Sequence, residues 1–114
     1  MIINGFEIDI DFTDADVIER IDKGREMILK EVEELENKKK NDEIKPAEGI
    51  RQECKMLKDF LDYVFGEGTS EKIFNGKDSL RDCIKAYEDI FKERDRQLNN
   101  LKEVMAKYSP DRLK

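Results

Sequence analysis

Residues 6–12 alternate between apolar and acidic side chains. Ile8 and Ile10 stand between Phe6 and Phe12, and an acidic residue separates each of these apolar positions from the next. An alternation with a period of two predicts a strand with one apolar face, and the Asn-Gly pair at positions 4 and 5 is a strong signal for a tight turn. We therefore expect a β-hairpin over residues 1–12. An isolated hairpin is marginally stable in water, so its apolar face should lie on helices or pair with another copy.

After residue 12, the apolar residues recur every three or four positions, which is the spacing of one helix face. Pro46 suits the first turn of a helix, and Gly66 with Gly68 is a stop signal, so the pattern divides into separate helices. The expected helices cover residues 13–41, 46–65 and 78–109, and residues 66–77 form a compact turn segment. Together these elements predict a mainly α fold of three long helices, as a bundle or hairpin, with a short N-terminal β-hairpin in a single domain, 1–114.

The first two long helices each show one apolar seam. Thr13 should cap the first helix through its hydroxyl, and Arg25 takes one inward slot of its seam. The apolar seam residues of the two helices are Ile18, Ile21, Ile28, Val32 and Leu35, and then Ile50, Cys54, Leu57, Leu61 and Val64.

The third long helix has the most regular pattern. Arg94 is the single polar member of its seam, which consists of Leu80, Ile84, Tyr87, Phe91, Arg94, Leu98, Leu101, Met105 and Tyr108. At a rise of about 1.5 Å per residue, about thirty residues reach roughly 45 Å, which is more than the first two helices cover. We therefore expect its far end to bind a protein chain, with the hairpin as a second candidate surface. The expected partner-binding residues are Leu98, Leu101, Met105, Tyr108, Phe6, Ile8 and Ile10.

The charge balance limits the classes of partner. The net charge is −6, and the only basic run, Lys38 to Lys40, directly follows an acidic stretch. Phosphate binding needs clustered Lys and Arg, so we expect no nucleic acid partner. No stretch approaches the ~20 apolar residues that span a bilayer, and we find no secretion signal, so we expect no membrane partner and a cytoplasmic location.

Candidate catalytic residues are few. Histidine, the commonest metal ligand and acid–base catalyst, is absent. Cys54 and Cys83 both fall on apolar helical stripes, so we expect two buried free thiols that act as small hydrophobic residues. We expect neither a cofactor nor catalysis.

The alternative within the enzyme class is an all-helical, magnesium-dependent nucleotide pyrophosphatase. Such an enzyme would hold its metal between acidic pairs on facing helices. Pairs of this kind arise by chance in so acidic a chain, so we expect no metal site, and a magnesium-dependent turnover assay would decide. The candidate pairs are Glu31 with Glu34, Glu33 with Glu36, Glu19 with Asp22, and Glu88 with Asp89.

Three short motifs carry a resemblance to a known class of protein. They are Ile3-Asn4-Gly5, then Phe65-Gly66-Glu67-Gly68-Thr69 running on to Ile73-Phe74, and finally Lys107-Tyr108-Ser109-Pro110. In this order, over nearly the whole chain, they resemble small prophage-encoded proteins of Gram-positive bacteria and, through them, phage tail assembly chaperones. The motifs are turns and anchors without catalytic residues.

The resemblance implies a non-enzymatic protein of the bacterial host cell that shields the tape measure protein until the tail tube forms around it. The partner would then be a phage tape measure or tail tube protein, and a homo-oligomer is a further expectation. Long apolar helix faces suit this role because a tape measure is itself a long helical protein. The alternative within the protein-binding class is an unrelated helical adaptor or regulator, and the genes beside this one would separate the two.

Overall fold

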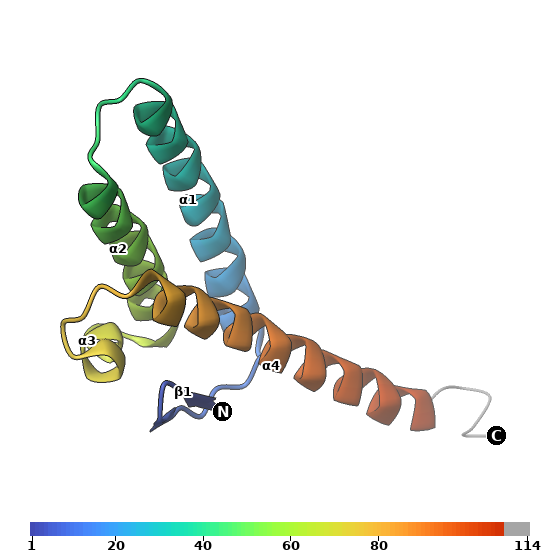
Figure 1. Ribbon diagram of the computed structural model, residues 1–114. Coiled ribbons are helices and arrows are strands. Elements are labelled where there is room, and N and C mark those ends of the chain that lie inside the picture. The colour runs from blue at the N-terminus through green and yellow to red at the C-terminus, as the bar shows by residue number, and fades with distance from the viewer. Residues whose placement is uncertain (109–114) are drawn as a thin grey trace.

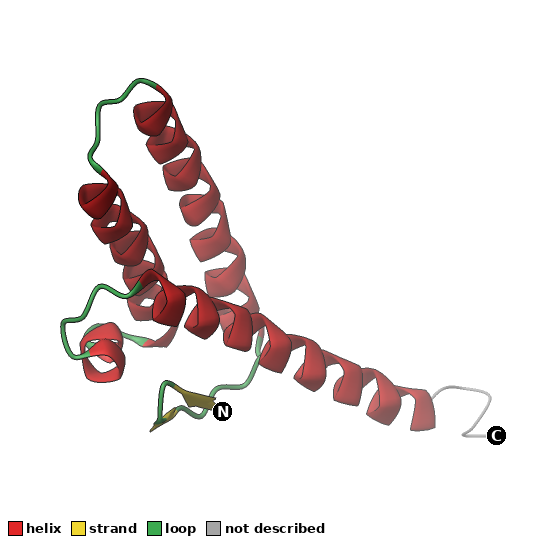
Figure 2. Cartoon of the chain, viewed as in Figure 1, coloured by secondary structure: helices red, strands yellow, loops and turns green. Residues whose placement is uncertain are grey.

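The computed structural model describes residues 1–108. Figures 1 and 2 show α1 and α2 as an antiparallel helical hairpin, with α4 crossing its lower end and projecting beyond it. The mainly helical fold class with an N-terminal β-hairpin is confirmed. In chain order, the elements are β1 (Ile2–Ile3), β2 (Phe6–Glu7), α1 (Ala15–Lys40), α2 (Pro46–Phe65), α3 (Thr69–Phe74) and α4 (Leu80–Lys107).

The N-terminal hairpin turns at the Asn-Gly pair, as the sequence predicts. Asn4 and Gly5 have φ values of 48° and 87°, which is the left-handed conformation that a tight hairpin turn requires. The strands pair in antiparallel register with Ile3 opposite Phe6. They are only two residues long, because the chain then leaves the ladder and continues towards Phe12, whose side chain is fully buried.

The cap of α1 differs from the prediction. Asp14 is the capping residue, and its carboxylate accepts hydrogen bonds from the backbone N–H groups of Asp16 and Val17. Thr13, predicted as the cap, instead donates its hydroxyl to the Asp11 carboxylate. A carboxylate at this position also interacts favourably with the positive end of the helix dipole.

The core lies where α2 packs against α1 and α4. Phe60 of α2 contacts Tyr87 edge-on, with 5.1 Å between ring centroids, and stacks on Phe91 at 6.1 Å. Gly24 of α1 lies directly against the Phe60 ring, since a Cβ at this glycine would be 2.8 Å from a ring carbon. Gly24 therefore occupies the inward position, and the prediction that Arg25 does so is wrong. Only a residue without a side chain allows α1 to approach the Phe60 ring this closely.

The two arginines of the predicted seams share one aromatic ring. The guanidinium carbons of Arg25 and Arg94 lie over the Phe91 ring, 5.4 Å and 4.7 Å from its centroid. Arg94 also forms an ion pair with Asp95 at 3.1 Å. Cation–π contacts therefore explain how both charges border the core without entering it.

Several residues predicted to lie on buried seams are exposed instead. The helices cross one another in Figure 1, so a stripe with a fixed spacing follows a neighbouring helix only over a short distance. The exposed members are Ile18 at 38%, Val32 and Ile50 at 41%, and Ile84 at 42%.

The predicted turn segment contains a helix of its own. The Asp62 carboxylate accepts hydrogen bonds from the backbone N–H and the hydroxyl of Ser70, which fixes the start of α3. Ile73 and Phe74 are buried, as expected of anchors. The description of residues 66–77 as a turn alone was therefore wrong, because the pattern of a six-residue helix is too short to distinguish from that of a turn.

The two cysteines are free and fully buried, as predicted. Burial, followed by a hydrogen bond with Cys54, raises the pKa of the Cys83 thiol to about 12. Burial also raises the pKa of Cys54. Both side chains therefore remain neutral thiols near neutral pH and contribute to packing between α2 and α4.

Candidate functional site

The support of α4 by the rest of the chain reaches as far as Gln97. The Gln97 side-chain amide donates to the Ile10 carbonyl at 3.0 Å, and its oxygen accepts from the Phe12 backbone N–H at 2.7 Å. These bonds fix the segment after the β-hairpin to α4. We call residues 98–108, which continue past this anchor, the distal arm. Figure 1 shows the arm projecting away from the other helices.

The distal arm carries an apolar stripe that the described chain leaves largely uncovered. Leu98 is half-buried beside the anchor, whereas Leu101 is 40% exposed, Met105 62% and Tyr108 65%. These four residues follow the three- and four-residue spacing that places side chains on one helix face. The arm is thus a helical surface suited to bind another helix by side-by-side packing.

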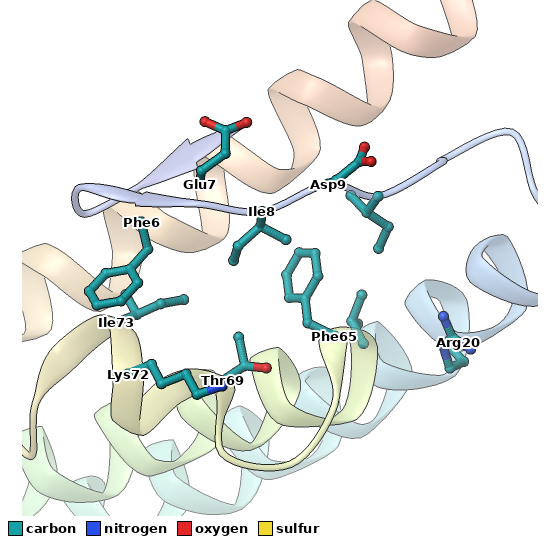
Figure 3. Close-up of a pocket in the computed structure, with 11 residues that line it drawn as sticks. Phe6, Glu7, Ile8, Asp9, Arg20, Phe65, Thr69, Lys72 and Ile73 are labelled. Carbon is teal, nitrogen blue, oxygen red and sulfur yellow. The ribbon is translucent and has the colours of Figure 1, made fainter.

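The predicted hairpin surface is a separate site. Phe6, Ile8 and Ile10 line a pocket of about 340 Å³ between the N-terminal segment and the α2–α3 corner. In Figure 3, the Phe6 ring lies near Ile73, and the Ile8 side chain points towards Phe65. Ile8 and Ile10 are half-buried, so they mainly fix the segment to the core, and Phe6, 44% exposed, is the more accessible of the three.

The pocket beneath the hairpin has mixed chemistry. Arg20 and Lys72 lie on its rim together with Glu7 and Asp9, and Thr69 points into it (Figure 3). Charges of both signs favour neither an anion nor a cation as ligand. The seven predicted binding residues therefore form two surfaces on different elements, and the structure does not join them into one.

Sequence reasoning missed a third surface, an apolar groove of about 340 Å³ between α1, α2 and the first half of α4. Val32, Leu35 and Ile84 line it, although the seam pattern assigned them to closed helix contacts. The sequence signal that could have predicted this groove is that the helices carry more apolar positions than one neighbouring helix can cover. Its other lining residues are Ile28, Glu36, Glu53, Met56, Leu57, Leu80 and Tyr87.

The acidic pairs considered for a metal are dispersed and partly bound to lysines. Glu31 and Glu34 border a surface hollow between α1 and α2. Within residues 1–108, no three acidic or cysteine side chains come together as ligands for one metal ion. Two of the candidate carboxylates take part in ion pairs along α1, Glu19 with Lys23 at 3.2 Å and Glu36 with Lys39 at 3.7 Å.

The basic run has a structural role on the surface of the helical hairpin. Lys39 bonds to Glu53 of α2, which raises the pKa of its ammonium group and connects the two helices near their loop. In the described part of the chain, no helix is both long enough and apolar enough to cross a membrane.

A family model matches residues 4–114 of the chain. The chain belongs to the DUF6673 family. The description of this family is "Family of unknown function", so membership gives no activity or partner. No curated protein and no solved structure matches the chain. The surfaces of this DUF6673 protein are therefore what indicates its function.

Proposed function

We propose that this DUF6673 protein is a non-enzymatic protein-binding protein that shields a helical partner, in the manner of a phage tail assembly chaperone. The observation that supports this role is the distal arm, where four large apolar side chains, those of Leu101, Val104, Met105 and Tyr108, remain at least 40% exposed. A helix end without tertiary contacts gains little stability from propensity alone, and an exposed apolar stripe typically marks an interaction site.

The chemistry of the arm favours a helical protein as the ligand. Leu101, Met105 and Tyr108 are spaced to pack along a second helix, and Met in particular adapts to differently shaped partners. Lys102 flanks the stripe and suits a partner with an acidic residue beside its own apolar face. A tape measure protein, long and helical, would meet this description.

The test is co-purification with the tape measure protein encoded in the same genome. The full chain should co-purify with it, and Leu101→Glu with Met105→Glu should reduce capture at least tenfold, because two charges would be buried in an apolar contact. The control is Asn99→Glu with Ala106→Glu, which adds the same charge elsewhere on the arm. Equal capture by both variants, with unchanged helical circular dichroism, would contradict the arm as the binding surface.

A further inference from the structure

We propose that two copies of this chain form an antiparallel dimer through α4, with the distal arm of each copy lying along the first half of α4 of the other. This inference goes beyond the proposed function, since it assigns a second copy of the chain to the arm when no tape measure protein is bound. It rests on three observations: an uncovered face along the first half of α4, a matching register, and complementary charge.

The first half of α4 has an open face beside its buried one. Cys83, Ala86 and Ile90 point into the core. Ile84 is 42% exposed, and Tyr87 and Phe91 are half-buried. The open face borders the apolar groove at Ile84 and Tyr87 and continues past Phe91 along a surface hollow that Arg25 and Arg94 border. A second helix could therefore lie along α4 on this side without displacing the core.

The sequence of α4 fits an antiparallel pairing of two identical helices. In such coiled coils, each a position packs beside a d position of the facing helix. If Leu98 and Met105 are a positions, Leu101 and Tyr108 are d positions, and the same frame places Ile84 and Phe91 at a. One register then pairs the whole arm with the open face: Tyr108 with Ile84, Met105 with Tyr87, Leu101 with Phe91, and Leu98 with the aliphatic stem of Arg94. The twofold axis repeats each pair.

The flanking charges favour this register over the adjacent one. In an antiparallel pair, e positions face e positions, so Lys102 faces Glu88 of the second copy, twice by symmetry. A shift by one heptad towards the N-terminus would bring Lys102 to Arg81 and Asp95 to Glu88, which are four like-charge contacts. In the proposed register, Asp95 lies beside its own counterpart at the twofold axis, and each Asp95 is already paired with Arg94 of its own copy.

The overall charge distribution favours the same contact. Residues 94–108 carry four basic and two acidic side chains, a net charge of +2. Residues 1–93 carry 16 basic and 25 acidic side chains, a net charge of −9. A positive arm from one copy is therefore attracted to the negative body of the other, and this attraction should weaken as salt is added.

A charge exchange tests the register. The purified full chain should elute in size-exclusion chromatography with light scattering at about 27 kDa, twice the 13.5 kDa of one chain. Lys102→Glu or Glu88→Lys alone should raise the dissociation constant of the dimer about tenfold, since each creates two like-charge contacts. The double exchange should restore it to within about threefold. Both side chains are exposed, so neither variant alters the core. A monomer at 100 µM protein, or no rescue by the exchange, would overturn the proposal.

Cysteine cross-linking locates the twofold axis independently. Asp95→Cys should form a disulfide with its own counterpart under mild oxidation, whereas Lys102→Cys, far from the axis, should not. The native cysteines do not interfere because both are fully buried. Strong cross-linking of Lys102→Cys would indicate another register and overturn the one proposed. These assays contain no tape measure protein. A negative result would therefore overturn the dimer alone, and the capture experiment would still test the proposed function.

Discussion

At the scale of single residues, one polar cluster decides where the supported part of α4 ends. The Glu93 carboxylate accepts hydrogen bonds from Arg96 and from Gln97, and Gln97 in turn holds the backbone of the N-terminal segment. The spacing of apolar residues does not predict that Gln97 is an anchor. Gln97 nevertheless lies on the same side of α4 as the buried residues Cys83 and Ile90. The cluster shows that the anchor of α4 is polar, while its core face is apolar.

The Glu93 cluster should make stability sensitive to acid. The hydrogen bond from Arg96, helped by Gln97, lowers the pKa of Glu93 to about 2 from its ordinary 4.5. A lowered folded-state pKa stabilises the fold fully above pH 4.5, and the contribution is lost as the pH falls from about 4.5 to about 2. We expect Glu93→Gln to lower the free energy of unfolding by about 1 kcal/mol at pH 7 and by much less near pH 2, since solvent screens the partly exposed pair.

Urea unfolding at pH 7 and at pH 2.5 measures this difference. Glu103→Gln is the control, because Glu103 is an exposed carboxylate of the same helix for which residues 1–108 show no ion pair. If Glu93→Gln and Glu103→Gln had the same effect at both pH values, the Glu93 cluster would not anchor the segment.

At the scale of elements, the packing of α1 on α2 depends on a glycine. Gly24→Ala would place a methyl group 2.8 Å from the Phe60 ring, which is itself confined by Tyr87 and Phe91. The strain of overpacking should exceed the gain in helix propensity of up to about 1 kcal/mol, so the free energy of unfolding should fall by about 1–2 kcal/mol.

A second helical glycine provides the matched control for this prediction. At Gly49, the nearest atom to an added Cβ is the flexible Lys39 Cε at 3.4 Å, so Gly49→Ala should gain helix propensity without a clash. Thermal melting should therefore show Gly24→Ala less stable and Gly49→Ala at least as stable as the original chain. Stabilisation by Gly24→Ala would mean that α1 and α2 are less closely packed than the structure shows.

At the scale of the whole molecule, the chain is elongated. Its radius of gyration is 17.5 Å, with extents of 65 × 29 × 20 Å, whereas a compact chain of this length has a radius of gyration of about 13 Å. The excess comes from α4, whose distal arm extends past the other helices (Figure 1). Such an arm exposes both apolar side chains and backbone hydrogen bonds, so it should be the least protected helical part of the monomer.

Amide hydrogen exchange should therefore depend on protein concentration. In dilute solution, amides of residues 99–107 should exchange much faster than those of residues 83–91, because the arm opens without disturbing the core. At concentrations where the dimer forms, protection of the arm should rise at least tenfold, while α2 should change little. Protection of the arm equal to that of the core at all concentrations would place it in a monomer core instead.

The prediction of elements from the sequence succeeded where the signal is local. Asn4 and Gly5 specify a turn that few other residues adopt, and Pro46 and Gly66 mark helix ends through their own backbone preferences. The start of α4 is also local, because the Ser79 hydroxyl accepts a hydrogen bond from the backbone N–H of Asp82. Ser109, the predicted end of the helix, lies outside the described residues.

The sequence by itself determined the helices, the hairpin and an α4 longer than its neighbours, since these follow from backbone propensity and apolar spacing within one segment. Only the tertiary structure decided which side of each stripe is covered. Gly24 became an inward position because Phe60 lies against it, and Ile84 stayed exposed because it lines the groove between α1, α2 and α4. Packing depends on the crossing angles between segments that are far apart in the chain. The spacing of apolar residues along one helix does not specify these angles.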